Sequence, residues 1–81
     1  MIEIEVLGTG CAKCRRVLKN VEKAISSTGI EAKVSKVEDL NEITRRGVLM
    51  TPGLAINGEI KAMGRIPSVR EIIEMLEEAG A

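Results

Sequence analysis

The hydrophobic and polar positions along the chain change period several times, and each change marks a predicted element. Residues 2–7 carry apolar side chains at every second position, which is typical of a strand. From about residue 12 to residue 28 the apolar positions recur at spacings of three and four, which predicts a helix with a single apolar stripe. Residues 30–35 alternate again and predict a second strand.

The second half of the chain predicts a short helix and a tight hairpin. Asp39 can cap a helix that Gly47 ends. Asn57 and Gly58 stand between two short apolar segments, and both central positions of a type I′ hairpin turn need positive φ. We therefore expect two antiparallel strands on either side of this turn.

Ser68 and Glu71 form a capping box that predicts the start of the last helix. The elements then follow the order βαβαββα. The first two strands bracket a helix, so they are expected to be parallel with a right-handed crossover. This pattern predicts an α/β fold with a four-stranded mixed sheet flanked by helices. At 81 residues, the chain is expected to be a single domain over residues 1–81.

Composition narrows the classes of function. The 12 Lys and Arg balance the 12 Asp and Glu, so there is no global basic field to attract nucleic acid. Without Phe, Tyr or Trp there are no aromatic side chains on which the bases of single-stranded nucleic acid could stack. Without His, the commonest general base and metal ligand is missing. Neither a signal-peptide pattern nor a membrane-length apolar run is present. We expect a cytoplasmic monomer with no nucleic-acid or membrane partner.

The charges are unevenly distributed between the first and the last predicted helix. The first is basic and the last is acidic, which makes the chain dipolar. This arrangement could steer an acidic partner toward the start of the first helix, but two solvated helix faces are the simpler interpretation. The residues concerned are Lys13, Arg15, Arg16, Lys19 and Lys23 in the first helix, and Glu71, Glu74, Glu77 and Glu78 in the last.

Cys11 and Cys14 have the spacing C-x-x-C and are the most evident chemistry in the chain. Such a pair between a strand and a helix indicates thiol–disulfide exchange. Cys14 shares the apolar stripe with Leu18 and Val21, so it should point into the core. Cys11 precedes the first full helical turn, where free N–H groups, the helix dipole and Lys13 favour the reactive thiolate. We predict that Cys11 is the nucleophile and Cys14 the resolving thiol.

Other interpretations of the cysteine pair remain open at this point. The pair could be two small buried side chains, a regulatory disulfide in a redox-inert module, or the thiolates of a ferredoxin-like Cu(I) carrier. A closed zinc site needs four ligands. One chain offers two thiols and no His, so only a dimer could complete such a site. The Cu(I) carriers run βαββαβ and end on a strand, whereas this chain is expected to end on a helix.

These features together resemble the thioredoxin-like superfamily, most closely its small single-domain redox proteins. The resemblance implies a protein-disulfide oxidoreductase that uses a Cys11–Cys14 disulfide and no further cofactor. Its implied partners are protein disulfides and a separate reductase. The motifs that carry the resemblance are Gly10, Cys11, Ala12, Lys13 and Cys14 after the first strand, Thr51 and Pro52 before the third, Asn57, Gly58 and Glu59 in the hairpin, and Gly64 before the last helix.

The resemblance also implies supporting residues around the cysteines. The peptide bond before Pro52 should be cis and face the pair, which would expose the Thr51 backbone for pairing with an extended substrate. Gly64 should leave room for that substrate. The residues expected to support substrate binding are Gly10, Ala12, Lys13, Thr51, Pro52 and Gly64.

Glu5 allows two interpretations. It lies six residues before Cys11, the offset at which many thioredoxins carry a buried acid that accepts a proton from the resolving thiol. The alternative, which we favour for this chain, is a solvated carboxylate on a thinly covered sheet face, like the neighbouring Glu3.

Overall fold

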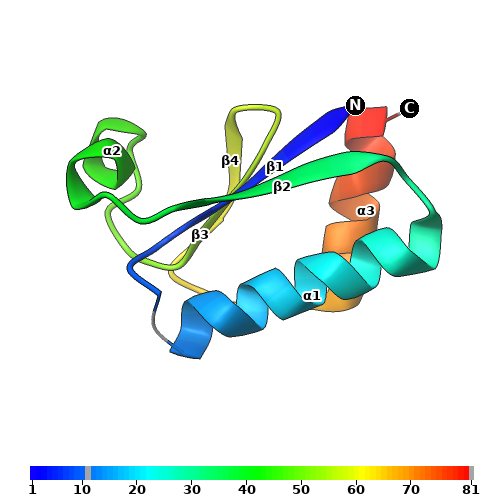
Figure 1. The fold of residues 1–81 in the computed structure, drawn as a ribbon, viewed down its shortest axis with the longest axis horizontal. Coiled ribbons are helices and arrows are strands. Elements are labelled where there is room, and N and C mark those ends of the chain that lie inside the picture. The colour runs from blue at the N-terminus through cyan, green and yellow to red at the C-terminus, as the bar shows by residue number, and fades with distance from the viewer. Residues whose placement is uncertain (11, 81) are drawn as a thin grey trace.

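Over residues 1–10 and 12–80, which the computed structural model describes, four strands form one mixed sheet and three helices pack against it (Figure 1). The strands are β1 (Ile2–Leu7), β2 (Ala32–Val37), β3 (Gly53–Ile56) and β4 (Glu59–Met63), and the helices are α1 (Ala12–Thr28), α2 (Leu40–Arg45) and α3 (Val69–Gly80). The predicted order βαβαββα and the α/β class are confirmed.

The sheet has the strand order β2-β1-β3-β4. β1 and β2 are parallel, while the β1–β3 and β3–β4 pairs are antiparallel. Asn57 and Gly58 have φ of 52° and 84°, as a type I′ turn requires. β2 begins two residues later than predicted, because residue 30 still takes part in the turn that follows α1. In this turn the Ile30 N–H donates a hydrogen bond to the Thr28 hydroxyl at 3.3 Å.

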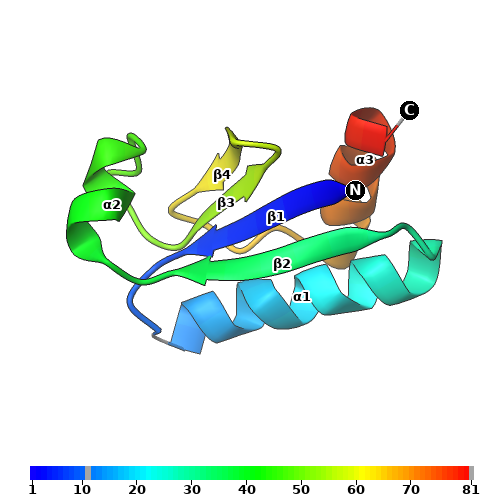
Figure 2. The ribbon, with the colours of Figure 1, turned by 45° about the horizontal axis from the view of Figure 1, so that its top comes forward.

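The two faces of the sheet are covered unequally. α1 and α3 lie side by side on one face and bury the main core (Figures 1 and 2). On the other face α2 covers only one end, where Leu7, Ile43, Val48 and Ala55 form a second small core. Alternation along β1 divides its side chains between the two faces, with Ile4 and Val6 toward α1 and Leu7 toward α2. No helix in the described ranges is long and apolar enough to span a membrane.

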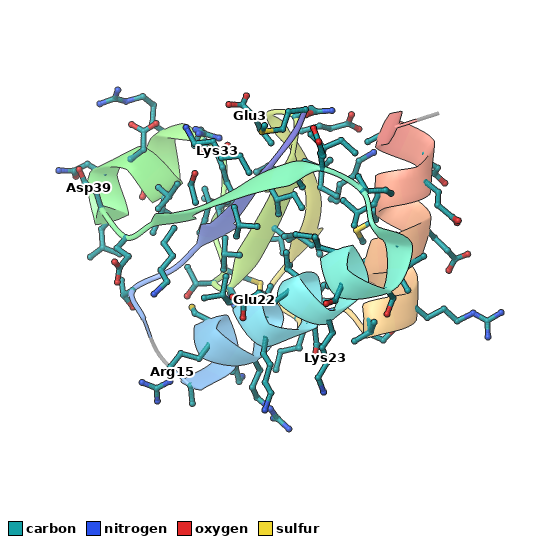
Figure 3. All side chains as sticks on the ribbon, turned by 45° about the vertical axis from the view of Figure 1, so that its right-hand side comes forward. Glu3, Arg15, Glu22, Lys23, Lys33 and Asp39 are labelled. Atoms are coloured by element: carbon teal, nitrogen blue, oxygen red, sulfur yellow. The ribbon has the colours of Figure 1, made fainter. Side chains whose placement is uncertain are left out.

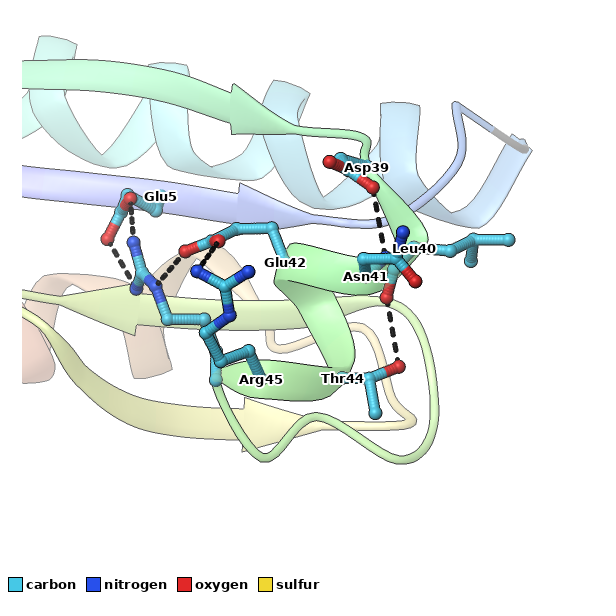
Figure 4. A network of polar contacts seen from close by, with 8 residues as sticks. Glu5, Asp39, Leu40, Asn41, Glu42, Thr44 and Arg45 are labelled. Atoms are coloured by element: carbon cyan, nitrogen blue, oxygen red, sulfur yellow. Dashed lines mark hydrogen bonds and ion pairs between the residues drawn. The ribbon is translucent and has the colours of Figure 1, made fainter.

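An ion-pair network fills part of the thinly covered face. Arg46, directly after α2, donates from Nη1 to Glu5 Oε1 at 2.9 Å and from Nη2 to the other carboxylate oxygen, and its Nε contacts Glu42 at 3.3 Å (Figure 4). The hydrogen bond to Glu5, and then the charge of Glu5, raise the pKa of Arg46. The Glu5 side chain lies on the thinly covered sheet face, as the favoured interpretation expected, but at 22% exposure and paired with Arg46 it is half-buried rather than solvated. Arg46 covers Glu5 from a distant part of the sequence.

Both predicted helix N-caps form. The Asp39 carboxylate accepts a hydrogen bond from the Asn41 N–H at 3.0 Å and caps α2 (Figure 4). In the capping box of α3, Ser68 Oγ accepts from the Glu71 N–H at 3.1 Å, and Glu71 Oε1 accepts from the Ser68 N–H at 3.2 Å. The Arg65 guanidinium also pairs with Glu71 at 2.8 Å.

The capping box makes the stability of the fold depend on pH. The Ser68 backbone N–H, and then the Arg65 guanidinium, lower the pKa of Glu71 from its ordinary 4.5. The stabilisation by this carboxylate is therefore complete above the unfolded pKa and is lost as the pH falls through the lower folded pKa. We expect Glu71→Gln to lower the thermal unfolding midpoint at pH 7, and we expect its difference from the wild type to shrink as the pH falls below 4.5, as followed by circular dichroism. Glu78→Gln, which removes a carboxylate outside the cap, is the control, and a difference for Glu71→Gln that does not shrink on acidification would contradict the assignment.

Candidate active site

The candidate site lies where the end of β1, the first turn of α1 and the loop before β3 meet. The Cys14 side chain is buried, with 6% of its surface exposed, which confirms the predicted inward orientation. A Cβ on Gly8 would clash with the Cys14 sulfur and would lie 3.8 Å from Thr51 Cβ. Cys14 and Thr51 therefore converge on Gly8, and the thiol fits at its observed position because Gly8 has no Cβ.

Cys11, the predicted nucleophile, lies outside the described residues. On either side of it, Gly10 and Ala12 are exposed, and so is Lys13 in the first turn of α1. Gly10 has a φ of +82°, a conformation that favours glycine over residues with a Cβ. The supporting residues predicted near the start of the helix thus form an accessible rim.

The loop before β3 brings Thr51, and with it Pro52, toward Gly8 and Cys14. The Thr51–Pro52 peptide bond is cis, as the resemblance implied. Pro52 is buried and Thr51 is exposed. The Pro52 carbonyl accepts a hydrogen bond from the Gly64 N–H at 2.9 Å, which ties this loop to the loop after β4. A Cβ on Gly64 would lie 3.1 Å from Met50 Cβ, so the Met50 side chain occupies the space that Gly64 leaves.

Three large apolar side chains are exposed around this loop, and we call them the loop patch. Leu49 is 82%, Met50 63% and Met63 43% exposed. The Leu49 N–H contacts the Met63 sulfur at 3.4 Å, while Met50 packs over Gly64. Adjoining exposed apolar side chains are typical of a binding surface. The sequence pattern did not indicate Leu49 and Met63, because no periodicity relates a loop residue to the end of β4.

A cavity of about 190 Å³ opens beside Cys14, between α1 and the end of β2. Its charged lining residues are Arg15, Lys36 and Glu38. Glu5 does not line it, because Glu5 lies on the opposite face of the sheet with Arg46. The offset of six residues from Cys11 therefore does not bring Glu5 to the cavity beside the resolving thiol.

Comparisons with known proteins agree with this geometry. A family model described as a thioredoxin domain matches residues 2–77. The chain belongs to the thioredoxin family. It is 41% identical over 76 residues to a thioredoxin of Methanothermobacter thermautotrophicus, covering 94% of this chain and 99% of the relative. It is 47% identical over 77 residues to a thioredoxin of Methanocaldococcus jannaschii, covering 95% of this chain and 88% of the relative.

A solved structure extends the comparison at the level of the fold. Thioredoxin-2, described as a component of the malaria parasite protein secretion machinery, superposes with a TM-score of 0.69 over 96% of this chain and 82% of that chain. The two sequences are 19% identical, so this likeness concerns the fold alone. It confirms the predicted thioredoxin-like architecture.

Membership of the thioredoxin family decides between the functions that the cysteine pair left open. The chain is a thiol–disulfide oxidoreductase, and the predicted enzyme class is confirmed. Thioredoxins act on protein disulfides and are reduced by a partner reductase. The Cu(I) carrier has no support from these relatives, and the described fold ends on α3 rather than on a strand.

Proposed function

We propose that Cys11 is the attacking thiol of this chain and Cys14 the resolving thiol. The observation that carries the proposal is the burial of Cys14 against Gly8 and beside Thr51. The attacking group must reach a substrate disulfide as an accessible thiolate, and a thiol covered in this way is poorly placed to do so. It is well placed to attack a neighbouring sulfur once a substrate has bound.

The proposed cycle transfers two electrons from the cysteine pair to the substrate. The Cys11 thiolate attacks one sulfur of a protein disulfide, forms a mixed disulfide and releases the other sulfur as a thiolate, which takes up a proton. Cys14 loses its proton and attacks the Cys11 sulfur. This forms the Cys11–Cys14 disulfide and releases the second substrate thiolate. A separate reductase returns two electrons, and no cofactor other than the cysteine pair takes part.

We propose that an extended segment of the substrate binds along the loop before β3. Thr51 is exposed, and we expect its backbone to pair with this segment, since Pro52 has no N–H to compete with the substrate. The loop patch would cover apolar side chains of the substrate, and Gly64 leaves the space that Met50 needs within this patch. The residues proposed to support binding are Gly10, Ala12, Lys13, Thr51, Pro52 and Gly64.

Insulin reduction with dithiothreitol as the electron source tests this placement. We expect Met50→Asp to raise the KM for insulin about 10-fold, since the full burial of such a side chain is worth roughly 1.5–3 kcal/mol. Leu40→Asp is the matched control. Leu40 is also 63% exposed, but it lies on α2 and points away from Glu5 and Glu42 (Figure 4). Equal KM values for the two variants would contradict substrate binding at the loop patch.

We also propose that residues 1–81 act as one cytoplasmic, monomeric domain. The two clusters of buried side chains share the strands β1 and β3, which supports a single folding unit. A dithiol that donates electrons works in a reducing compartment such as the cytosol. Sedimentation of the reduced protein is expected to give the mass of one chain, 8.7 kDa.

A further inference from the structure

The outer side of α1 carries five cations, and we call it the basic face. All five side chains are exposed, and Glu22 is the one acidic residue of the helix. Arg15 and Lys23 project from α1 away from the sheet (Figure 3). Within the described ranges, none of the five takes part in an ion pair. The basic face consists of Lys13, Arg15, Arg16, Lys19 and Lys23.

This arrangement works against the stability of the helix in two ways. Lys19 stands four residues from both Arg15 and Lys23, and like charges at that spacing repel on a helix surface. The first turn contains no acidic residue, so its cations oppose the positive end of the helix dipole. The acidic helix α3 packs beside α1, yet no ion pair in the described part of the chain joins them. Unfavourable charge placements of this kind, which no ion pair in the described residues offsets, are typical of a functional surface.

The position of the basic face relates it to the cysteine pair. α1 begins at Ala12, directly after Cys11, and Cys14 lies in its first turn. Arg15 borders the cavity beside Cys14. Further along the helix, Arg16, Lys19 and Lys23 line a shallow groove with Asn20 and Ile66. The cations thus form a continuous path that leads toward the site.

We propose that the basic face docks protein substrates whose disulfide is flanked by acidic residues. The proposal rests on the proposed function, because docking matters only if the cysteine pair then reduces the substrate. Complementary charges raise the rate of encounter by about 10- to 1,000-fold in strongly steered complexes, and salt screens this advantage. A face built for stability would pair these cations within the chain, whereas a docking face leaves them for the partner.

The test uses three synthetic disulfide peptides that differ only in their flanking residues, which are glutamates, lysines or serines. At low ionic strength we expect the reduced protein to react with the acidic peptide at least about 10-fold faster than with the basic one, and the ratio to approach one in 0.5 M salt. The combined variant Arg16→Gln, Lys19→Gln and Lys23→Gln should lose the preference. Its unfolding midpoint should stay the same or rise, because the substitutions relieve repulsion. A matched variant on α3, with Glu74→Gln, Glu77→Gln and Glu78→Gln, should keep the preference.

The outcomes separate this inference from the proposed function. If the serine-flanked peptide is reduced but the three peptides react equally at low salt, the docking proposal fails and the proposed function stands. If no peptide is reduced, the proposed function itself fails. A lower unfolding midpoint in the α1 variant would assign the cations a structural role and overturn the proposal. Equal peptide rates together with salt-sensitive binding of a single-stranded oligoribonucleotide would assign the face to nucleic acid instead.

Discussion

Replacing either cysteine by serine is expected to abolish the turnover of protein disulfides, by at least about 10³-fold, because the two thiols act as one unit. The two variants should differ in how much substrate they retain as a covalent mixed disulfide. Cys14→Ser retains the attacking thiol and lacks the one that resolves, so it should stay covalently bound to its substrate. Cys11→Ser lacks the attacking thiol, and the remaining Cys14 is buried, so it should capture little or no substrate.

Mass spectrometry of the two variants after incubation with insulin gives the decisive comparison. The Cys14→Ser sample should contain a covalent adduct with insulin, and dithiothreitol should release it. Ser27→Ala, which changes an exposed hydroxyl near the far end of α1, is the control and should turn over like the wild type. An adduct that forms only with Cys11→Ser would reverse the proposed roles.

Gly8→Ala is expected to reduce both activity and stability, although it adds a single methyl group. The new Cβ would clash with the Cys14 sulfur, so the thiol or the end of β1 must move. Overpacking of this kind costs about 1–3 kcal/mol, and each kcal/mol lowers the unfolding midpoint of a domain this size by roughly 4–8 °C. A displacement of about 1 Å at a reacting group costs about 100-fold in rate. In Gly8→Ala, the attack of Cys14 on the mixed disulfide should therefore slow by about 100-fold.

Gly29→Ala separates the two effects. Gly29 has a φ of +69° and open space around its Cβ position, so alanine there costs roughly 1–2 kcal/mol through the backbone alone. It lies after the last turn of α1, at the opposite end of the helix from Cys14. We expect a comparable loss of thermal stability with wild-type insulin reduction. Gly8→Ala with full activity would show that the Cys14 position is not set by Gly8.

Much of the fold followed from local signals in the sequence. Helical spacing placed Cys14 on the buried face of α1, and the turn at Asn57 and the capping box at Ser68 formed as predicted. Each of these features depends on residues a few positions apart. The cis bond before Pro52 was predicted from the family resemblance. The sequence alone would favour trans, because most X-Pro bonds in folded proteins are trans.

What the sequence did not indicate depends on contacts between distant segments. Glu5 is covered by Arg46, 41 residues later, and no pattern of charges pairs these two positions. The loop patch joins Leu49 to Met63 across the loop before β3 and the end of β4. The crowding of Gly8 by Cys14 likewise appears only when α1 folds back against β1. Such sites are set by tertiary packing, which periodicity within one element does not encode.

The accessibility of the two thiols in the reduced wild-type protein tests the division of roles most directly. Limited iodoacetamide labelling near pH 6, followed by peptide mass mapping, measures the alkylation rate of each cysteine separately. We predict that Cys11 is labelled well before Cys14, because burial protects Cys14, whereas Cys11 is proposed to react as the accessible thiolate. Equal labelling, or labelling of Cys14 first, would contradict the assignment of an attacking and a resolving thiol.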